Sequence, residues 1–288
     1  VHAETRTPFE LIVVDNASSD GSAEAIAEAF PDAILIAESE NHGFAAAHRL
    51  AEERARAPWL LLLNPDTVVL DGAIDNLLAY AGETPEAGIW GGRTLFADGR
   101  LNPSSAWGRM TLFSTISRAL GLSAVFRRSS LFNSEEIGGW DRSTPREVDI
   151  VSGCFFLMRR ADWDRFGGFD PAFVMYGEEA DLCLRARAEG VRPRMTPEAT
   201  IIHHGGASEA VRADKMVRLM RAKTELIRRH FHPGTRRLGA ALFACWPLSR
   251  ALAWRLLVLT GRRGAAEKAA TWSEIWRRRG EWTGGYSA

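Results

Sequence analysis

Short apolar runs alternate with amphipathic segments along the first two thirds of the chain. The runs are rich in Val, Ile and Leu and end at a polar residue, which is typical of buried strands in a sheet covered on both faces. We predict strands at Phe9–Asp15, Ala33–Ile36, Trp59–Leu63, Gly88–Gly92, Val148–Met158 and Ala199–His204. Segments of helical periodicity lie between them, at Ser22–Phe30, Phe44–Arg56, Asp71–Tyr80 and Glu178–Glu189. This alternation predicts an α/β protein.

Two regions depart from that alternation. Residues 101–146 mix Ser, Trp, Phe and Arg without a firm period, and we expect a long excursion of the kind that forms lids or binding loops. Its aromatic residues would bind an acceptor, face a membrane or anchor the loop: Trp107, Phe113, Phe126 and Phe132. Beyond the last strand the pattern is helical, at 208–230, 238–260 and 268–279. We therefore place a domain boundary at residue 208, with a core of 1–208 that includes the excursion and a helical region of 209–288.

The charge of the chain is unevenly distributed, although its formal net charge is zero. Residues 206–288 hold 17 Lys and Arg against 6 Asp and Glu, so the helical region is basic and the core is acidic. A basic region of this kind favours an anionic partner such as a membrane surface, and a solvated basic helix is the alternative. We expect no nucleic-acid partner.

The apolar part of the helical region is too short in sequence for a spanning helix. Residues 238–248 carry no charge, but Pro247, Arg250 and Arg255 interrupt the roughly 20 apolar residues that a bilayer requires. We expect an amphipathic helix lying in the membrane interface, with Trp246 and Trp254 near that boundary. Packing of the helix on the core is the alternative.

The composition is that of a globular protein, at 46% hydrophobic and 25% charged residues. The three cysteines, Cys154, Cys183 and Cys245, lack the spacing of a metal site. We expect buried free thiols in a reducing compartment.

Acidic residues recur where the predicted strands end. Asp15 ends the first strand and Asp66 follows the strand Trp59–Leu63. In open α/β sheets ligands bind outside the carboxyl ends of the strands, so the pair indicates a ligand site. Either residue alone would also suit the cap of a helix.

Four motifs around these positions resemble family 2 glycosyltransferases, and in particular their rhamnosyltransferase-like members. Val14–Ser22 (VDNASSDGS) is similar to the nucleotide-binding signature, and Leu63–Thr67 (LNPDT) to the metal motif. Phe166–Asp170 (FGGFD) with Tyr176–Arg185 (YGEEADLCLR) resembles the acceptor and general-base region, and Ile202–Ser208 (IHHGGAS) the metal-binding His segment. The resemblance spans 9–208 and implies a GT-A-type, Rossmann-like, mostly parallel sheet flanked by helices, followed by a helical C-terminal tail.

The resemblance also implies roles for individual residues. The metal would be Mg²⁺ or Mn²⁺, held by Asp66 and His203, because hard cations prefer such ligands beside phosphate oxygens. Asn64 stands where the family usually has the first acid of the metal motif. The residues implied to bind the nucleotide sugar are Asp15, Asn16, Asp20, Gly43 and Asn64.

The resemblance assigns the chemistry to the pair Glu178–Glu179. Inversion needs one carboxylate that takes a proton from the acceptor hydroxyl, and we expect Glu179 to be this base, with Glu178 as the second candidate. Acids at the N-terminus of a helix are also favoured by the helix dipole alone. Gly168, Phe169 and Asp170 are implied to bind the acceptor, and we expect Asp181 to pair with Arg185.

One departure from the family lies at the start of the chain. Family members open with an apolar strand followed by a helix, and Val1–Thr7 resembles the end of that helix. We therefore expect the first strand to be absent, with weaker nucleotide binding and lower stability as the result.

The resemblance implies transfer of a sugar, with inversion, from a nucleotide-diphosphate donor to a hydroxyl of a glycan or lipid-linked acceptor. The form of the LNPDT motif favours deoxythymidine-diphosphate-rhamnose as donor, in cell-surface polysaccharide or cell-wall synthesis. We expect a cytoplasmic protein, peripheral on the inner face of the plasma membrane through its C-terminal helices. The alternatives are a sugar-phosphate nucleotidyltransferase and a non-catalytic, membrane-associated partner subunit.

Overall fold

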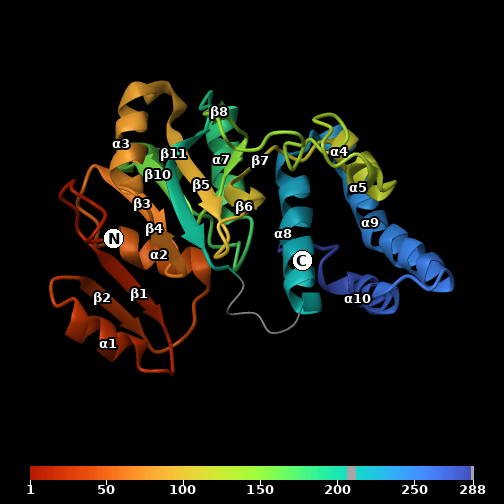
Figure 1. The fold of residues 1–288 in the computed structure, drawn as a ribbon, viewed down its shortest axis with the longest axis horizontal. Helices are drawn as coiled ribbons and strands as arrows, with labels where there is room; N and C mark the ends of the chain where they lie inside the picture. The colour runs from red at the N-terminus through yellow and green to blue at the C-terminus, as the bar shows by residue number, and fades with distance from the viewer. Residues whose placement is uncertain (206–211, 287–288) are drawn as a thin grey trace. The chain divides into compact units, whose positions relative to one another are not determined.

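The computed structural model describes residues 1–205 and 212–286 (Figure 1). The chain forms two compact units, of which unit 1 comprises Val1–Ala106 and Thr144–His204, and unit 2 comprises Trp107–Ser143 and Gly205–Ala288. The excursion that the sequence assigned to the core therefore groups, over residues 107–143, with the C-terminal helices. Its helix α4 (Leu112–Ala119) packs against α9 (Pro233–Leu259) of the same unit.

A seven-stranded sheet forms the centre of unit 1. Its strand order is β3 (Trp59–Leu63), β10 (Phe155–Arg159), β5 (Ile89–Leu95), β11 (Arg194–His203) and β4 (Thr67–Val69), with β6 (Leu101–Asn102) beside β5 and β8 (Arg146–Glu147) beside β11. The α/β class is confirmed, but the sheet is mixed and not mostly parallel. The reason is that β10 lies antiparallel between β3 and β5, and β4 lies antiparallel to β11. The strands β3, β5 and β11 still share one direction, so their carboxyl ends lie at one edge.

A second, two-stranded parallel sheet contains β1 (Ile12–Asn16) and β2 (Ile34–Glu38). The helices α1 (Ser22–Ala29) and α2 (Phe44–Glu52) follow these strands in turn. The vacant strand position that the sequence predicts beside this half of the protein stays a prediction. Two short strands, β7 (Ala106–Trp107) and β9 (Ile150–Val151), and the 3₁₀ turns η1 (Pro85–Ala87), η2 (Pro103–Ser105) and η3 (Arg279–Glu281) complete the irregular parts of the chain.

Apolar side chains cover both faces of the main sheet. Leu77 of α3 (Ala73–Glu83) is fully buried in one cluster with Trp90, Phe155 and Leu157. Phe156 projects to the opposite face because side chains alternate along a strand, and its ring centroid lies 6.4 Å from that of Phe169. That second face also carries α6 (Arg160–Phe166) and α7 (Glu178–Ala188), which contact β10 and β9.

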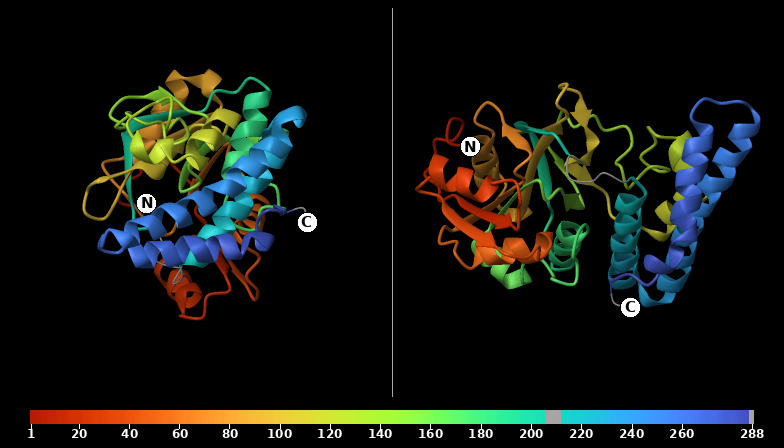
Figure 2. Two further views of the ribbon diagram at one scale, coloured as in Figure 1. Left: turned by 90° about the vertical axis from the view of Figure 1, so that its right-hand side faces the viewer. Right: turned by 90° about the horizontal axis from the view of Figure 1, so that it is seen from below.

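Unit 2 is helical, as predicted for the C-terminal region. It contains α4, α5 (Leu122–Val125), α8 (Arg212–His230), α9 and α10 (Ala265–Arg277), and α9 and α10 run side by side (Figure 2). Helix α9 continues through Pro247, as the helix predicted at 238–260 does. Trp246 is only 7% exposed and packs with Phe243 and Trp282, so its predicted place at a membrane boundary is wrong.

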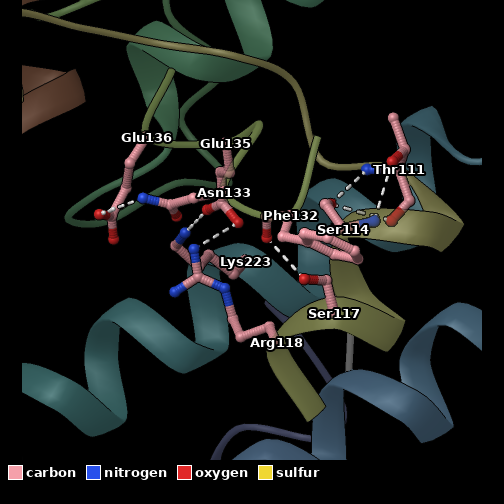
Figure 3. Close-up of polar contacts among 9 residues, drawn as sticks. All are labelled: Thr111, Ser114, Ser117, Arg118, Phe132, Asn133, Glu135, Glu136 and Lys223. Carbon is pink, nitrogen blue, oxygen red and sulfur yellow. Dashed lines mark hydrogen bonds and ion pairs between the residues drawn. The ribbon is translucent and has the colours of Figure 1, made fainter. Parts of the chain in front are cut away.

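A buried ion cluster joins the excursion to the helices of unit 2 (Figure 3). Glu135 accepts a hydrogen bond from Arg118 of α4 at 2.8 Å and forms a second ion pair with Lys223 of α8. The Glu135 and Arg118 side chains are 7% and 11% exposed. The cluster thus ties residues that are distant in sequence into one body, at the cost of removing three charges from water.

Candidate functional site

Asp66 and His203 meet at one edge of the main sheet. The chain leaves β3, turns through Asn64-Pro65-Asp66 and returns as β4, which pairs with the end of β11 so that Thr67 lies opposite His203. This pairing places His203 Nε2 3.1 Å from Asp66 Oδ1. The backbone N–H of His204 donates to the carbonyl of Asp66 at 2.9 Å, which fixes the two segments in register. Two residues separated by more than 130 positions therefore form one pair of donor atoms.

Asn64 lies beside this pair with an oxygen that lacks a partner. Its side-chain Nδ2 is 3.5 Å from His203 Nε2, and its backbone N–H donates to the carbonyl of Cys154 at 3.1 Å. Its Oδ1 is buried and receives no hydrogen bond within the described part of the chain. Because an unpaired buried oxygen costs stability, this atom is suited to accept a hydrogen bond from a ligand.

The two predicted catalytic acids open helix α7. Glu178 is 4% exposed and Glu179 is partly buried. Burial raises the pKa of both carboxyl groups, and the charge of Glu179 raises the pKa of Glu178 further. Backbone hydrogen bonds at the start of α7 oppose the rise in the pKa of Glu179. Glu178 Oε2 is a second buried oxygen without a partner among the described residues.

Cys154 connects the two halves of the site. Burial raises the pKa of its thiol to about 11, and the negative charges of Glu179 and Asp66 both add to the rise. Its neighbour Gly153 borders Glu179, since a Cβ added to Gly153 would lie 3.5 Å from the Glu179 Cβ. The charges of Glu179 and Asp66 therefore both act on one thiol, and Glu179 borders the turn whose next residue holds Asn64.

A network of amide side chains organises the end of β1. Asn16 Nδ2 donates to Asn41 Oδ1 at 3.1 Å and to the carbonyl of Gly43 at 3.2 Å, and the N–H of His42 donates to Asn16 Oδ1 at 2.9 Å. Asn16 thus holds the loop 41–43 against β1. Asp15, the last buried acid of this strand, accepts from the N–H of Ser18 at 3.2 Å.

Gly43 joins this loop to the segment before the catalytic acids. Its φ is +83°, and an added Cβ would lie 2.6 Å from the carbonyl oxygen of Val174. The N–H of Phe44 donates to that same oxygen at 3.2 Å. Only glycine combines this backbone conformation with this close approach. The predicted nucleotide loop and the loop that leads to Glu178 are therefore in direct contact.

Asp20 has a local role. It is exposed and accepts from the backbone N–H of Ser22 at 3.1 Å and from its hydroxyl at 2.5 Å, at the start of α1. These bonds lower the pKa of Asp20, with the hydroxyl bond the larger cause. The structure places Asp20 among its own neighbours and not with Asp66 and His203, so its binding of a nucleotide stays a prediction.

The three residues predicted to bind the acceptor have contacts that shape the turn before α7. Phe169 is 5% exposed and packs on Trp163 at a centroid distance of 4.9 Å, and Asp170 Oδ1 accepts from the N–H of Ala172 at 2.8 Å. The carbonyl of Gly168 accepts from Arg185 Nη2 at 2.6 Å. Acceptor binding by these residues stays a prediction.

The expected pair of Asp181 and Arg185 is confirmed. Arg185 Nε lies 2.7 Å from Asp181 Oδ2, and Asp181 is almost fully buried. Because Arg185 also bonds the carbonyl of Gly168, this pair fixes α7, and with it Glu178 and Glu179, to the preceding loop.

The donor set fits a divalent cation that the substrate also coordinates. Within residues 1–205 and 212–286, no group of three or more His, Cys, Asp or Glu side chains is arranged to hold a metal. Asp66 and His203 supply two donors of the kind that hard divalent cations accept, and such an ion would supply positive charge beside a bound anion.

Comparison with known proteins identifies the family. The family model described as Glycosyl transferase family 2 matches residues 1–166. The chain belongs to glycosyl transferase family 2. It is 28% identical over 218 residues to the N-acetylglucosaminyl-diphospho-decaprenol L-rhamnosyltransferase of Mycobacterium tuberculosis, which covers 69% of this chain and 68% of that protein. It is also 32% identical over 222 residues to the O-antigen biosynthesis protein RfbC of Myxococcus xanthus, covering 74% of this chain and 16% of that protein.

Solved structures agree on the fold of this family 2 glycosyltransferase. The mannosyltransferase PcManGT from Pyrobaculum calidifontis, solved with GDP-Man and Mn²⁺, superposes with a TM-score of 0.56 at 18% identity. The match covers 95% of this chain and 78% of that one. The GT-A-type α/β fold is therefore confirmed, and the nucleotidyltransferase and partner-subunit alternatives are not favoured.

Sequence reasoning missed the Ser152–Cys154 turn of this site. Gly153 borders Glu179, and Cys154 holds Asn64 through its carbonyl. The signal in the sequence was the Ser-Gly-Cys break inside the run Val148–Met158, which we interpreted as one strand and which the structure divides into β9 and β10.

Proposed function

We propose that this glycosyltransferase transfers a 6-deoxyhexose such as rhamnose from a nucleoside-diphosphate donor to a hydroxyl of a glycan or lipid-linked acceptor, with inversion. The single observation that carries the proposal is the arrangement of Asp66, His203 and Glu179 around the Asn64 and Cys154 backbone contact. This arrangement supplies a site for a diphosphate. It also supplies a nearby carboxylate, that of Glu179, which can take a proton.

The proposed reaction is one displacement. The acceptor hydroxyl loses its proton to Glu179 as its oxygen bonds the anomeric carbon, and the bond from that carbon to the diphosphate oxygen breaks on the opposite side. The nucleoside diphosphate leaves with the electron pair. Glu179 suits this role because its burial raises its pKa, which makes the carboxylate a stronger base.

The other residues of the site bind the donor. A divalent cation held by Asp66 and His203 would neutralise the charge of the departing diphosphate. The free Oδ1 of Asn64 would accept from a hydroxyl of the sugar or the ribose. Asp15, beside the loop that Asn16 and Gly43 organise, would accept from the base edge of a uracil- or thymine-type nucleotide.

The choice of sugar and acceptor rests on the relatives. The mycobacterial relative is named as an L-rhamnosyltransferase acting on N-acetylglucosaminyl-diphospho-decaprenol, and the relative from Myxococcus xanthus as an O-antigen biosynthesis protein. We carry this over as deoxythymidine-diphosphate-rhamnose for the donor and a diphosphate-linked lipid for the acceptor. Such an acceptor implies a position on the inner face of the plasma membrane.

Two measurements test the proposal. Thermal shift with Mn²⁺ across a panel of nucleotide sugars should show the largest stabilisation with deoxythymidine-diphosphate-rhamnose, because a ligand that binds only the folded state raises its melting temperature. Hydrolysis of that donor, followed by release of the nucleoside diphosphate, should depend on Mn²⁺ and on Glu179. A larger increase in melting temperature with another donor would mean that rhamnose is not the transferred sugar. Hydrolysis that is unaffected by Glu179→Gln would overturn the mechanism.

A further inference from the structure

Helix α9 carries an exposed apolar stripe along its whole length. Leu238, Cys245, Leu252 and Leu259 follow one another at intervals of seven residues, and Leu256 lies on the same face one turn after Leu252. The four leucines are 53%, 50%, 66% and 83% exposed in the order of the chain, and Cys245 is exposed as well. We call these five residues the α9 stripe. Leucines this exposed, aligned on one helix face, indicate a surface that meets another apolar phase.

The opposite face of α9 is fixed to the rest of unit 2. Phe243, Trp246 and Ala251 are buried there, and Phe243 and Trp246 share a core with Ile275 of α10 and Trp282. The helix also packs against α4 and α8. The stripe is therefore one side of a helix that its own unit holds along its length.

The charges near the stripe have one sign. From Pro233 to Gly264 the chain has six arginines and neither Asp nor Glu. Arg237 and Arg255 are exposed and lie on the flank of the stripe, and Arg262 and Arg263 are exposed at the turn after α9. Each such residue within reach of an anionic bilayer strengthens binding to it.

We infer that the α9 stripe is the bilayer-contacting surface of this protein, with α9 lying parallel to an anionic membrane and its leucines among the acyl chains. The arginines reach the phosphate groups while their aliphatic stems stay beside the stripe. This inference rests on the proposed function in one respect, which is that the contacted membrane leaflet is the cytoplasmic one.

Two other occupants fit the observations less well. By length and composition α9 also qualifies as a membrane-spanning helix among the described residues. Spanning would carry the packed helix α10 into the hydrocarbon with Glu267, Lys268 and Glu274, and charged side chains there are strongly disfavoured. If the stripe bound a second copy of the chain, the arginines of both copies would meet at one interface. Residues 233–264 contain no Asp or Glu that could pair with them.

The natural cysteines make the inference testable at one position. Cys154 and Cys183 are buried, and burial raises their thiol pKa values to about 11 and about 12, whereas Cys245 is exposed within the stripe. An environment-sensitive nitrobenzoxadiazole label should therefore react at Cys245 in the folded protein. We expect its emission to shift to the blue and to be quenched by brominated acyl chains when vesicles of phosphatidylcholine and phosphatidylglycerol are added. Pure phosphatidylcholine, or added salt, should reduce the effect.

Two variants distinguish vesicle binding through the α9 stripe from nonspecific hydrophobic adsorption. The double change Leu252→Ser and Leu256→Ser should weaken vesicle binding about tenfold or more, since two leucines no longer leave water. Phe96→Ser, which removes an apolar residue of 40% exposure from unit 1, should leave binding unchanged. Both proteins should hydrolyse the donor in solution like the unaltered chain. Because vesicle binding is read without turnover, inactivity with normal binding would count against the proposed function alone.

Three outcomes would overturn the inference. Emission that is unchanged by anionic vesicles would mean that the stripe stays in water or is covered. A Cys245–Cys245 disulfide on mild oxidation, together with a dimer in analytical ultracentrifugation, would assign the stripe to a second copy. Protease protection of α10 in vesicles, with binding that salt does not reverse, would show a spanning helix.

Discussion

Replacement of Glu135 by glutamine should destabilise unit 2 far more than the loss of an exposed carboxylate there. Glu135 is the shared partner of Arg118 and Lys223, and the three side chains are 7%, 11% and 19% exposed (Figure 3). Breaking a buried ion pair at one end costs about 3–5 kcal/mol, because the remaining charge stays buried without a partner. Lys223 has the greater access to water and a flexible chain, so Arg118 should account for most of the loss, which we place at about 3 kcal/mol.

The assay is chemical denaturation, with hydrogen exchange of peptides from α4 and α8 to assign the loss to unit 2. Glu281→Gln is the matched control, because Glu281 pairs with Arg278 at 2.7 Å in the same unit but is 53% exposed. We expect little or no loss of stability there, because water screens an exposed ion pair. Replacing Glu135, Arg118 and Lys223 together by Leu, Met and Met should restore most of the stability. A loss for Glu135→Gln no larger than that of the control would refute the reasoning.

Further predictions concern the catalytic centre. Glu179→Gln should lower the rate of transfer by about 10²–10⁴-fold without lowering the melting temperature, and retained turnover would remove Glu179 as the base. Since burial raises the pKa of Glu179, kcat/KM should fall as the pH drops through the folded-state pKa of this carboxyl group. The raised pKa of Glu178 means that its contribution to stability is present in acid and lost as the pH rises through the folded-state pKa. Glu178→Gln should therefore raise the melting temperature at neutral pH more than in acid, and equal shifts would contradict this. Gly43→Ala places a Cβ 2.6 Å from the Val174 carbonyl and should raise KM for the donor in initial-rate measurements, whereas an unchanged KM would show that the loop adapts.

Much of the fold followed from local pattern. The strand Trp59–Leu63 was predicted with its observed bounds, because an uninterrupted apolar run before Asn-Pro has no stable alternative. Helix α7 was predicted to within one residue, since acids open it and Gly190 follows its end. Both segments are strong local signals that tertiary packing reinforces.

The features of the fold that the sequence did not predict depend on contacts between residues distant in sequence. The three residues of β4 have no period of their own and become a strand only by pairing with β11. The excursion 107–143 joined the C-terminal helices through Glu135 and Lys223, a contact that no local pattern indicates.

The candidate site divides in the same way. Family motifs indicated Asp66, His203 and Glu179, and the structure gives a 3.1 Å contact for the first two. The contribution of Cys154 was not predictable, because it acts through its backbone carbonyl and its position, neither of which depends on the type of side chain. Phe169 was chosen for an acceptor role from its motif, and its burial against Trp163 shows how a core residue can sit inside a functional motif.

The central claim is that Asp66 and His203 jointly bind a divalent cation with the donor diphosphate. Electron paramagnetic resonance of free Mn²⁺, titrated with protein in the presence of deoxythymidine diphosphate, measures this directly. Asp66→Ala and His203→Ala should each weaken Mn²⁺ binding about tenfold or more, whereas Glu179→Gln should bind Mn²⁺ like the unaltered protein. Unchanged Mn²⁺ affinity in both Asp66→Ala and His203→Ala would contradict the account.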